Sequence, residues 1–256
     1  MRTSFVLTVA QSKRLIAKGV AQMPEVKHAL ADGILAIGRG TTNAYVVEEI
    51  LGKTITKQDY VLGRTLPPGV PGGWLGGSSD ADVVLKRGRL VADGDVAAAV
   101  QGMGAGDVFI KGGNALDYQR KVVGVLIGHP TGGTAGATYG TIVSRKINLI
   151  LPIGLEKLVC EDIVSLSVDS RHPDSHPNAP CVPLFPLVGT VVTELEALAL
   201  LCGVKARLLS SGGVAGAEGA VWLMVEGDRE SLDRALALHG SLAGEPNMGL
   251  TRKPDD

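Results

Sequence analysis

Short apolar runs, each ended by a turn that contains glycine or polar residues, recur along the first part of the chain. The runs fall at residues 33–37, 107–111, 122–127 and 147–153, and helical patterns separate them at 42–51, 95–101 and 134–145. Continuous apolar strands that alternate with helices are typical of a mainly parallel sheet with both faces covered. The pattern therefore predicts an α/β fold: a Rossmann-like, mainly parallel sheet with helices on both faces.

The pattern changes after residue 161. Residues 162–168 alternate like a strand, a Pro-rich segment follows, and then a helix (191–202), two strands (204–210 and 220–226) and a last helix (229–242). This order predicts a small C-terminal α+β domain with an antiparallel sheet, close to a ferredoxin-like half. The predicted organisation is an α/β ligand-binding domain (1–165), a Pro-rich connector (166–187), a small α+β domain (188–246) and a tail (247–256).

Three further segments have local signatures. Residues 5–9 resemble a strand, residues 12–31 have helical character with a break near Met23-Pro24, and residues 60–79 are rich in Pro and Gly. We expect the last of these to be an exposed excursion.

Composition narrows the class of protein. The chain has 256 residues, 45% hydrophobic and 20% charged, with a net charge of −1. A nucleic-acid-binding protein usually shows a basic surplus, so no nucleic-acid partner is expected. No apolar run approaches a membrane span, and three irregularly spaced cysteines do not suggest a disulfide framework. We expect a cytoplasmic protein without a membrane partner, and a homo-oligomer.

The junction "LAIGRGTTNAYVVEEILG", residues 35–52, is a candidate anion site. Its two glycines permit close backbone approach, a Thr or Asn can cap the helix that follows, and the arginine can add a charge-assisted contact. Exposed N–H groups at a helix N-terminus suit phosphate or carboxylate. The alternative is a capped turn without a ligand. The candidate ligand-binding residues are Gly38, Arg39, Gly40, Thr41, Thr42 and Asn43.

A second candidate segment is "GDVFIKGGNALD", residues 106–117. Lys111 falls at the carboxyl end of the predicted strand, where open α/β sheets place their ligands. We expect Lys111 to be catalytic, with Gly112, Gly113 and Asn114 binding the ligand. The alternative is a solvated lysine at a turn.

A third glycine cluster, "GHPTGGTAGATYG", again follows a strand and precedes a helix. Its candidate ligand-binding residues are Thr131, Gly132, Gly133 and Thr134, which can hold a second anionic group; close packing of the helix on the sheet is the alternative. Neither a GxGxxG nor a GxxxxGK[ST] motif is present, so no nucleotide cofactor is expected.

The Pro-rich segment contains residue types that bind metals. His172, His176 and Cys181 lie there with Asp169 and Asp174, but their spacing matches no regular zinc pattern. The expected reading is a solvated linker, with no metal.

Together, "IGRGTTNAYVVEEIL" and "FIKGGNAL" resemble a superfamily that contains type A ribose-5-phosphate isomerase, initiation factor 2B-like proteins, sugar-phosphate deaminases and CoA transferases. Its isomerases have a Gly-Thr-Gly-Ser-Thr phosphate turn and a later Lys-Gly-Gly run. The positions that match are Gly38, Gly40, Thr41, Thr42, Lys111, Gly112, Gly113, Ala115 and Leu116. The resemblance spans roughly residues 33–150, and the isomerase's small α+β appendage parallels the C-terminal region.

The chain departs from the isomerases at their carboxylates. The region of their Asp-Gly-Ala-Asp-Glu motif reads "AAAVQGMGAGD" here, and Arg120 stands nine residues after the lysine, where they have the catalytic glutamate. The resemblance thus implies a phosphate-binding frame without ribose-5-phosphate isomerisation. We expect a site for a small phosphorylated or carboxylated metabolite, serving an isomerase-like or group-transfer enzyme. The alternative is a non-catalytic metabolite sensor or assembly protein.

Overall fold

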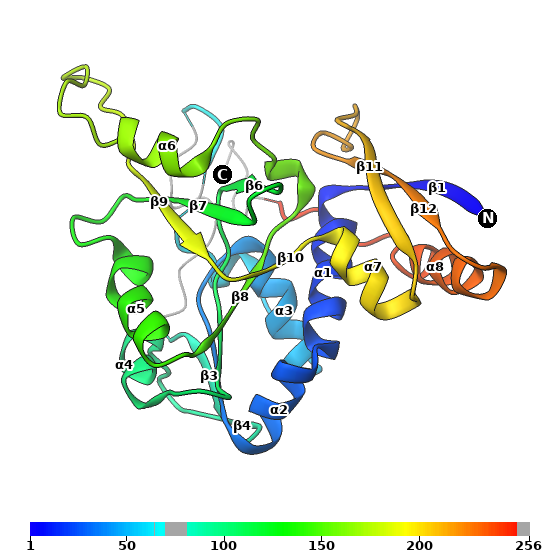
Figure 1. The fold of residues 1–256 in the computed structure, drawn as a ribbon, viewed down its shortest axis with the longest axis horizontal. Coiled ribbons are helices and arrows are strands. Elements are labelled where there is room, and N and C mark those ends of the chain that lie inside the picture. The colour runs from blue at the N-terminus through cyan, green and yellow to red at the C-terminus, as the bar shows by residue number, and fades with distance from the viewer. Residues whose placement is uncertain (64, 70–80, 250–256) are drawn as a thin grey trace, which may run out of the picture.

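The computed structural model describes residues 1–63, 65–69 and 81–249. In this part the chain is a mixed α/β protein built around three sheets (Figure 1). Most of the predicted excursion at 60–79 and most of the predicted tail at 247–256 lie outside the described residues.

The central sheet has the strand order β10-β8-β5-β2-β3-β4. Its first four strands are parallel, and β3 and β4 extend it with antiparallel pairing. The strands are β2 (Ile34–Ile37), β3 (Val83–Lys86), β4 (Arg89–Leu90), β5 (Val108–Ile110), β8 (Asn148–Pro152) and β10 (Thr190–Val192). The sheet is thus mixed, with a parallel part that carries the predicted apolar runs 33–37, 107–111 and 147–153.

Helices cover both faces of the central sheet, as Figure 1 shows. One face packs on α1 (Val9–Gln22), α2 (Pro24–Asp32) and α3 (Thr41–Leu51); the other packs on α4 (Val96–Ala99) and α5 (Gly133–Ser144). Successive strand side chains point to opposite faces. Val108 and Ile110 of β5 therefore pack on the face covered by α1, α2 and α3, and Phe109 between them packs on the opposite face.

A three-stranded antiparallel sheet, β6-β7-β9, lies beside the central sheet. Its strands are β6 (Ala115–Asp117), β7 (Val122–Leu126) and β9 (Leu184–Val188), and α6 (Ile163–Asp169) packs against β7 and β9. The run 122–127 was therefore correctly predicted as a strand, but it belongs to this second sheet. Strand β9 lies in the segment that was expected to be a Pro-rich connector.

The expectation of a strand at 162–168 is wrong, because residues 163–169 form α6 with Asp162 as its N-cap. The Asp162 side chain accepts a hydrogen bond from the Val164 backbone N–H and caps the helix. Ile163 and Ser167, four residues apart, are its buried positions. Helical spacing therefore describes the buried face, although the apolar letters alternate.

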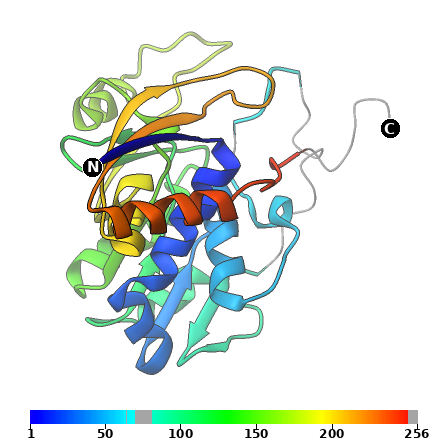
Figure 2. The ribbon, with the colours of Figure 1, turned by 90° about the vertical axis from the view of Figure 1, so that its right-hand side faces the viewer.

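The third sheet, β1-β12-β11, combines a strand from the start of the chain with two strands from its C-terminal part (Figures 1 and 2). Strand β1 (Arg2–Leu7) pairs antiparallel with β12 (Val221–Glu226), which also pairs with β11 (Lys205–Ser211). Helices α7 (Glu194–Cys202) and α8 (Arg229–Ser241) accompany these strands. The C-terminal α+β elements are present as predicted, and the sequence did not indicate that the N-terminal strand completes their sheet.

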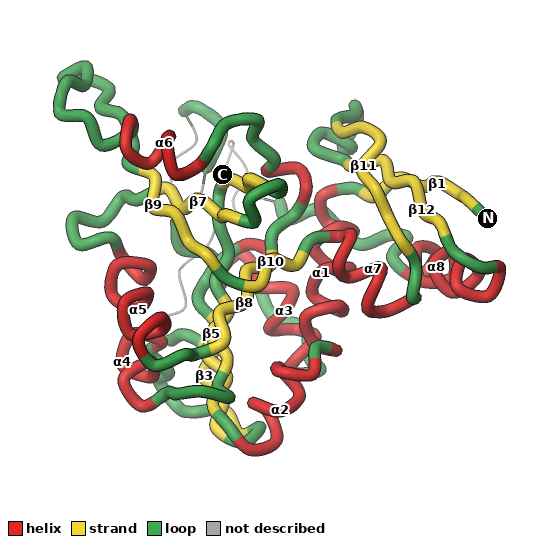
Figure 3. Tube along the Cα trace, viewed as in Figure 1, coloured by secondary structure: helices red, strands yellow, loops and turns green. Residues whose placement is uncertain are grey.

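Single-turn 3-10 helices complete the described structure, and Figure 3 shows how loops connect all these elements. They are η1 (Lys57–Tyr60), η3 (Val100–Gly102) and η4 (Leu155–Lys157). Among the described residues no helix has the length and apolar character needed to cross a membrane.

Candidate functional site

The first two candidate segments meet at one cavity of about 650 Å³. It lies where the parallel strands β2 and β5 end, as the rule for open α/β sheets requires. From the first segment Arg39, Gly40, Thr41 and Thr42 line it, and from the second Lys111, Gly112, Gly113 and Asn114. Two motifs far apart in the sequence, at the ends of the neighbouring strands β2 and β5, thus share one space.

The N-terminus of α3 opens into this cavity. Its N-cap is Gly40, which has no side chain to cover the first-turn N–H groups. The hydroxyl of Thr42, a residue only 3% exposed, has no hydrogen-bond partner among the described atoms. Buried hydroxyls are normally satisfied. The helix end therefore offers N–H donors and one unpaired buried hydroxyl to whatever fills the cavity.

Gly38 and Asn43 of the first segment do not line the cavity; they shape the turn between β2 and α3. Asn43 is fully buried and donates from Nδ2 to the Gly38 carbonyl oxygen at 2.7 Å. A Cβ on Gly38 would lie 3.3 Å from Cδ of Lys111, so this glycine lets the lysine pass closely. Arg39 bridges to Asp82, with 2.9 Å between Nε and Oδ1.

Lys111 extends into the cavity from the end of β5. Its ammonium donates to the Gly112 carbonyl oxygen at 3.1 Å. Within the described residues no carboxylate comes within 4.0 Å of this ammonium. Burial, followed by the positive charge of Lys157, lowers the pKa of Lys111 to about 8.

Two further lysines line the same cavity, and sequence reasoning missed both. Lys157 is in η4, directly after β8, and donates to the Gly113 carbonyl oxygen at 2.8 Å. Lys13 comes from α1. Burial lowers the pKa of Lys157, and lowers that of Lys13 to about 8, while the Glu156 carboxylate opposes both shifts.

The strand-end rule would have indicated Lys157, because "PIGLEKL" follows β8 at the same edge as Lys111. Nothing in the sequence indicated Lys13, which the fold brings in from a helix near the N-terminus.

Beside two glycines of the cavity wall there is space for a side chain that no described atom fills. A Cβ on Gly40 would meet described atoms only at 3.9 Å, and one on Gly112 only at 3.7 Å or more. Gly40 is extended, with φ 168°, and Gly112 is not among the positive-φ residues, so neither backbone requires glycine. Side chains here would project into the cavity, and their absence keeps it open.

The third candidate cluster lies on a neighbouring cavity. Thr131, Gly133 and Thr134 line it together with Asp82, Asp93 and Asp95, and Arg39 lies between the two cavities. Gly132 is the left-handed N-cap of α5, and a Cβ on Gly136 would lie 2.2 Å from the Thr131 carbonyl oxygen. Small residues thus serve a tight turn here. Thr134 lies near the first cavity, since a Cβ on Gly38 would lie 4.0 Å from its Cγ2 and 3.3 Å from Cδ of Lys111.

A buried carboxylate pair lies next to the lysines. Glu194, at the start of α7, is fully buried and accepts from the Leu155 backbone N–H at 3.0 Å. Burial, together with the nearby Glu156 carboxylate, raises the pKa of Glu194 to about 7. Oε2 of Glu156 is buried and has no partner among the described atoms. Neither residue was indicated by the sequence pattern.

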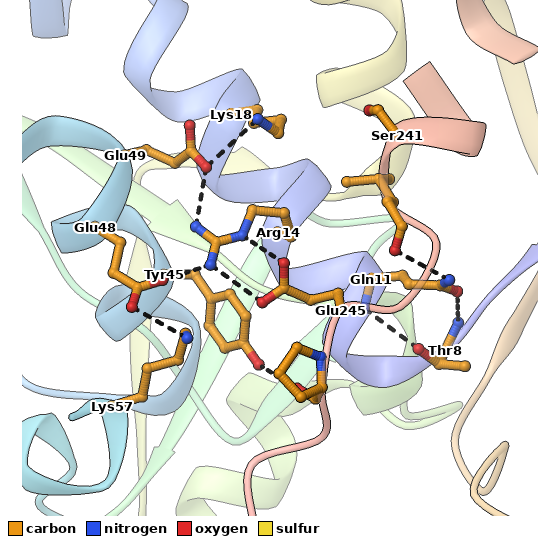
Figure 4. A network of polar contacts seen from close by, with 12 residues as sticks. Thr8, Gln11, Arg14, Lys18, Tyr45, Glu48, Glu49, Lys57, Ser241 and Glu245 are labelled. Carbon is orange, nitrogen blue, oxygen red and sulfur yellow. Dashed lines mark hydrogen bonds and ion pairs between the residues drawn. The ribbon is translucent and has the colours of Figure 1, made fainter. Parts of the chain in front are cut away.

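The last described residues also reach the cavity, where Met248 and Gly249 form part of its wall. A network at Arg14 fixes the segment that leads to them (Figure 4). Arg14 pairs with Glu245 at 2.9 Å between Nε and Oε2, and also with Glu48 and Glu49 of α3. Gln58 donates to the Gly249 carbonyl oxygen at 3.2 Å.

The Pro-rich residues form no metal centre in the described chain. His172, His176 and Cys181 are exposed, and no group of three or more His, Cys, Asp or Glu side chains in this part of the structure is arranged to hold a metal ion.

Comparison of the chain with protein-family models, with curated proteins and with solved structures finds no match in any of the three. The function is therefore argued from the site alone.

Proposed function

We propose that the protein binds a small phosphorylated or carboxylated metabolite in the cavity between α3 and β5. The observation that carries this proposal is the meeting of an uncapped helix N-terminus with Lys13, Lys111 and Lys157. Cations and backbone N–H groups that converge on one space favour an anion. The whole chain has a net charge of −1, so this concentration of lysines is a local feature.

The architecture supports the same proposal. We interpret the central sheet as Rossmann-like, since it has four adjacent parallel strands with helices on both faces, and the β1-β12-β11 unit as ferredoxin-like. In such sheets ligands bind outside the carboxyl ends of the strands. The cavity occupies that place.

The chemistry we propose is isomerase-like or group transfer through an enolate-like state, other than ribose-5-phosphate isomerisation. Lys111 would stabilise the negative charge that develops on the substrate oxygen or transfer a proton, and Asn114 would orient the ligand. A cation that is preorganised where negative charge develops is effective in this role. The residues that stand where the isomerases carry their carboxylates, Arg120 among them, do not support the ribose reaction.

Thermal-shift measurements test the binding. Sugar phosphates, nucleotides and CoA esters are screened against the wild type, Lys111→Ala and the control Lys53→Ala, which removes an exposed lysine. We expect one ligand class to raise the Tm of the wild type and of Lys53→Ala, and to raise that of Lys111→Ala much less. Equal responses of the three proteins to every ligand would contradict the proposal. Turnover of a ligand that binds then separates an enzyme from a sensor.

A further inference from the structure

Among the three lysines of the cavity, Lys111 differs in its charged neighbours. Lys13 and Lys157 both feel the Glu156 carboxylate, which favours their ammonium forms. Among the described residues, no carboxylate favours the Lys111 ammonium, and the charge that acts on it is the Lys157 cation. Burial and the Lys157 charge therefore both disfavour the Lys111 ammonium, whose hydrogen-bond partner is the neutral Gly112 carbonyl oxygen.

A lysine that is desolvated or placed beside another cation becomes a nucleophile, because more of it is the neutral amine at neutral pH. For Lys111 both conditions hold, and the lowered pKa of about 8 agrees with them. The side chain also lines an open cavity, so that a substrate carbon can reach the amine. The α3 N-terminus and Thr42 lie in the same cavity, where they can hold an anionic group of that substrate.

We propose that Lys111 forms an imine with an aldehyde or ketone that also carries a phosphate or carboxylate group. The amine nitrogen attacks the carbonyl carbon, the new C–N bond forms, and the carbonyl π electrons move to oxygen. That oxygen takes a proton from the attacking nitrogen to give a carbinolamine. A second proton, supplied by the Lys157 ammonium and replaced from solvent, lets the hydroxyl leave as water. The protonated imine then withdraws electrons from the neighbouring carbon.

This inference rests on the proposed anion site for substrate orientation, and the structure allows the two to be tested separately. The probe is glyceraldehyde 3-phosphate, with unphosphorylated glyceraldehyde as its comparison. Cyanoborohydride reduces any imine to a stable secondary amine, and peptide mass mapping then locates the adduct. The proteins are the wild type and Lys111→Arg, which keeps the positive charge. Lys53, exposed to solvent, gives the background rate within each sample.

We expect Lys111 to be labelled at least tenfold faster than Lys53, and the labelling to be lost in Lys111→Arg. Inorganic phosphate should slow the reaction with glyceraldehyde 3-phosphate and raise the Tm of both proteins. Labelling of Lys111 no faster than Lys53, or preferential labelling of Lys13 or Lys157, would overturn the inference. A phosphate thermal shift without Lys111 labelling leaves the anion site standing, whereas Lys111 labelling by glyceraldehyde without any phosphate effect contradicts the anion site alone.

Discussion

Lys111 is held in the cavity at a cost to folding. Its pKa is about 8 in the folded protein, below the ordinary lysine value of 10.5. Between these values the unfolded chain binds more protons, so stability rises with pH across this window. The cost is fully present below pH 8 and disappears as the pH rises past 10.5.

We therefore expect Lys111→Met to stabilise the protein at pH 7. The gain should be on the order of 2 kcal/mol, since each pKa unit corresponds to about 1.4 kcal/mol and the cavity is open to solvent. Urea unfolding of both proteins at pH 7 and pH 10.5 measures it. The difference should nearly vanish at the higher pH, and a variant that is less stable than wild type at pH 7 would contradict this account.

Two cavity glycines should respond differently to alanine. In Gly113→Ala the new Cβ would lie 2.1 Å from Cγ1 of Val123, so we expect a loss of about 1–3 kcal/mol from overpacking. In Gly40→Ala the Cβ has room, so stability should be kept while ligand affinity falls about tenfold, or about 1.4 kcal/mol. Chemical unfolding measures the loss of stability in Gly113→Ala, and ligand titration measures the loss of affinity in Gly40→Ala. Unchanged affinity in Gly40→Ala would show that the ligand does not approach this turn.

At the scale of single residues, the sequence could indicate only the site groups that follow a strand along the chain. Gly40 and Lys111 come directly after β2 and β5, and a strand end is a local signal. Lys13 and Glu194 reach the site through packing of α1 and α7, which depends on contacts far apart in the sequence. No local pattern carries that information.

At the scale of elements, α6 shows how a cap can outweigh an alternating pattern. The letters of "DIVSLSV" fit a strand, but Asp162 satisfies the Val164 backbone N–H and starts a helix. Two other unexpected strands, β6 and β10, are each 3 residues long, too short for periodicity to show. Long helices such as α1, α5 and α8 were predicted because the helical spacing of their apolar residues extends over several turns.

The cap at Asp162 leads to a prediction for α6. Asp162→Ala removes the acceptor for the Val164 N–H, and we expect a loss of about 1 kcal/mol, typical of an N-cap. Asp162→Asn keeps an acceptor oxygen and loses only the charge, which also faces Arg120 at 3.6 Å. In denaturant unfolding, we therefore expect the free energy of unfolding of Asp162→Asn to be close to that of the wild type and that of Asp162→Ala to be lower. Equal losses in both variants would mean that the ion pair, and not the cap, stabilises this end.

At the scale of the whole molecule, the cavity depends on parts of the chain that lie far apart in sequence. The N-terminal strand β1 pairs with the C-terminal strand β12 in the β1-β12-β11 sheet, and α1 runs from that sheet to pack against α3 and α7 (Figure 2). Lys13 and Arg14 are neighbours on α1. One lines the cavity, and the other ties α1 to α3 and to the segment that bears Met248. Helix α1 thus connects the small sheet to the cavity.

Arg14 should therefore matter both to stability and to binding. Its side chain is 13% exposed, and it pairs with Glu48, Glu49 and Glu245, which raise its pKa although burial opposes the charge. Arg14→Met leaves these carboxylates without their shared cation, and breaking a buried pair from one side costs about 3–5 kcal/mol. The Arg2–Glu226 pair on β1 and β12 is exposed, so Arg2→Met serves as the matched control and should leave the Tm unchanged.

In Arg14→Met, the segment that bears Met248 and Gly249 loses the ion pair that holds it at Glu245. We expect Arg14→Met to bind the anionic ligand more weakly even at a temperature where it is fully folded, and Glu245→Gln to weaken binding with a smaller loss of stability. Calorimetric titration at low temperature, with folding checked by circular dichroism, measures this. If both variants bind as tightly as wild type while unfolding more easily, the Arg14 network supports the fold alone, and the wall at Met248 contributes nothing to recognition.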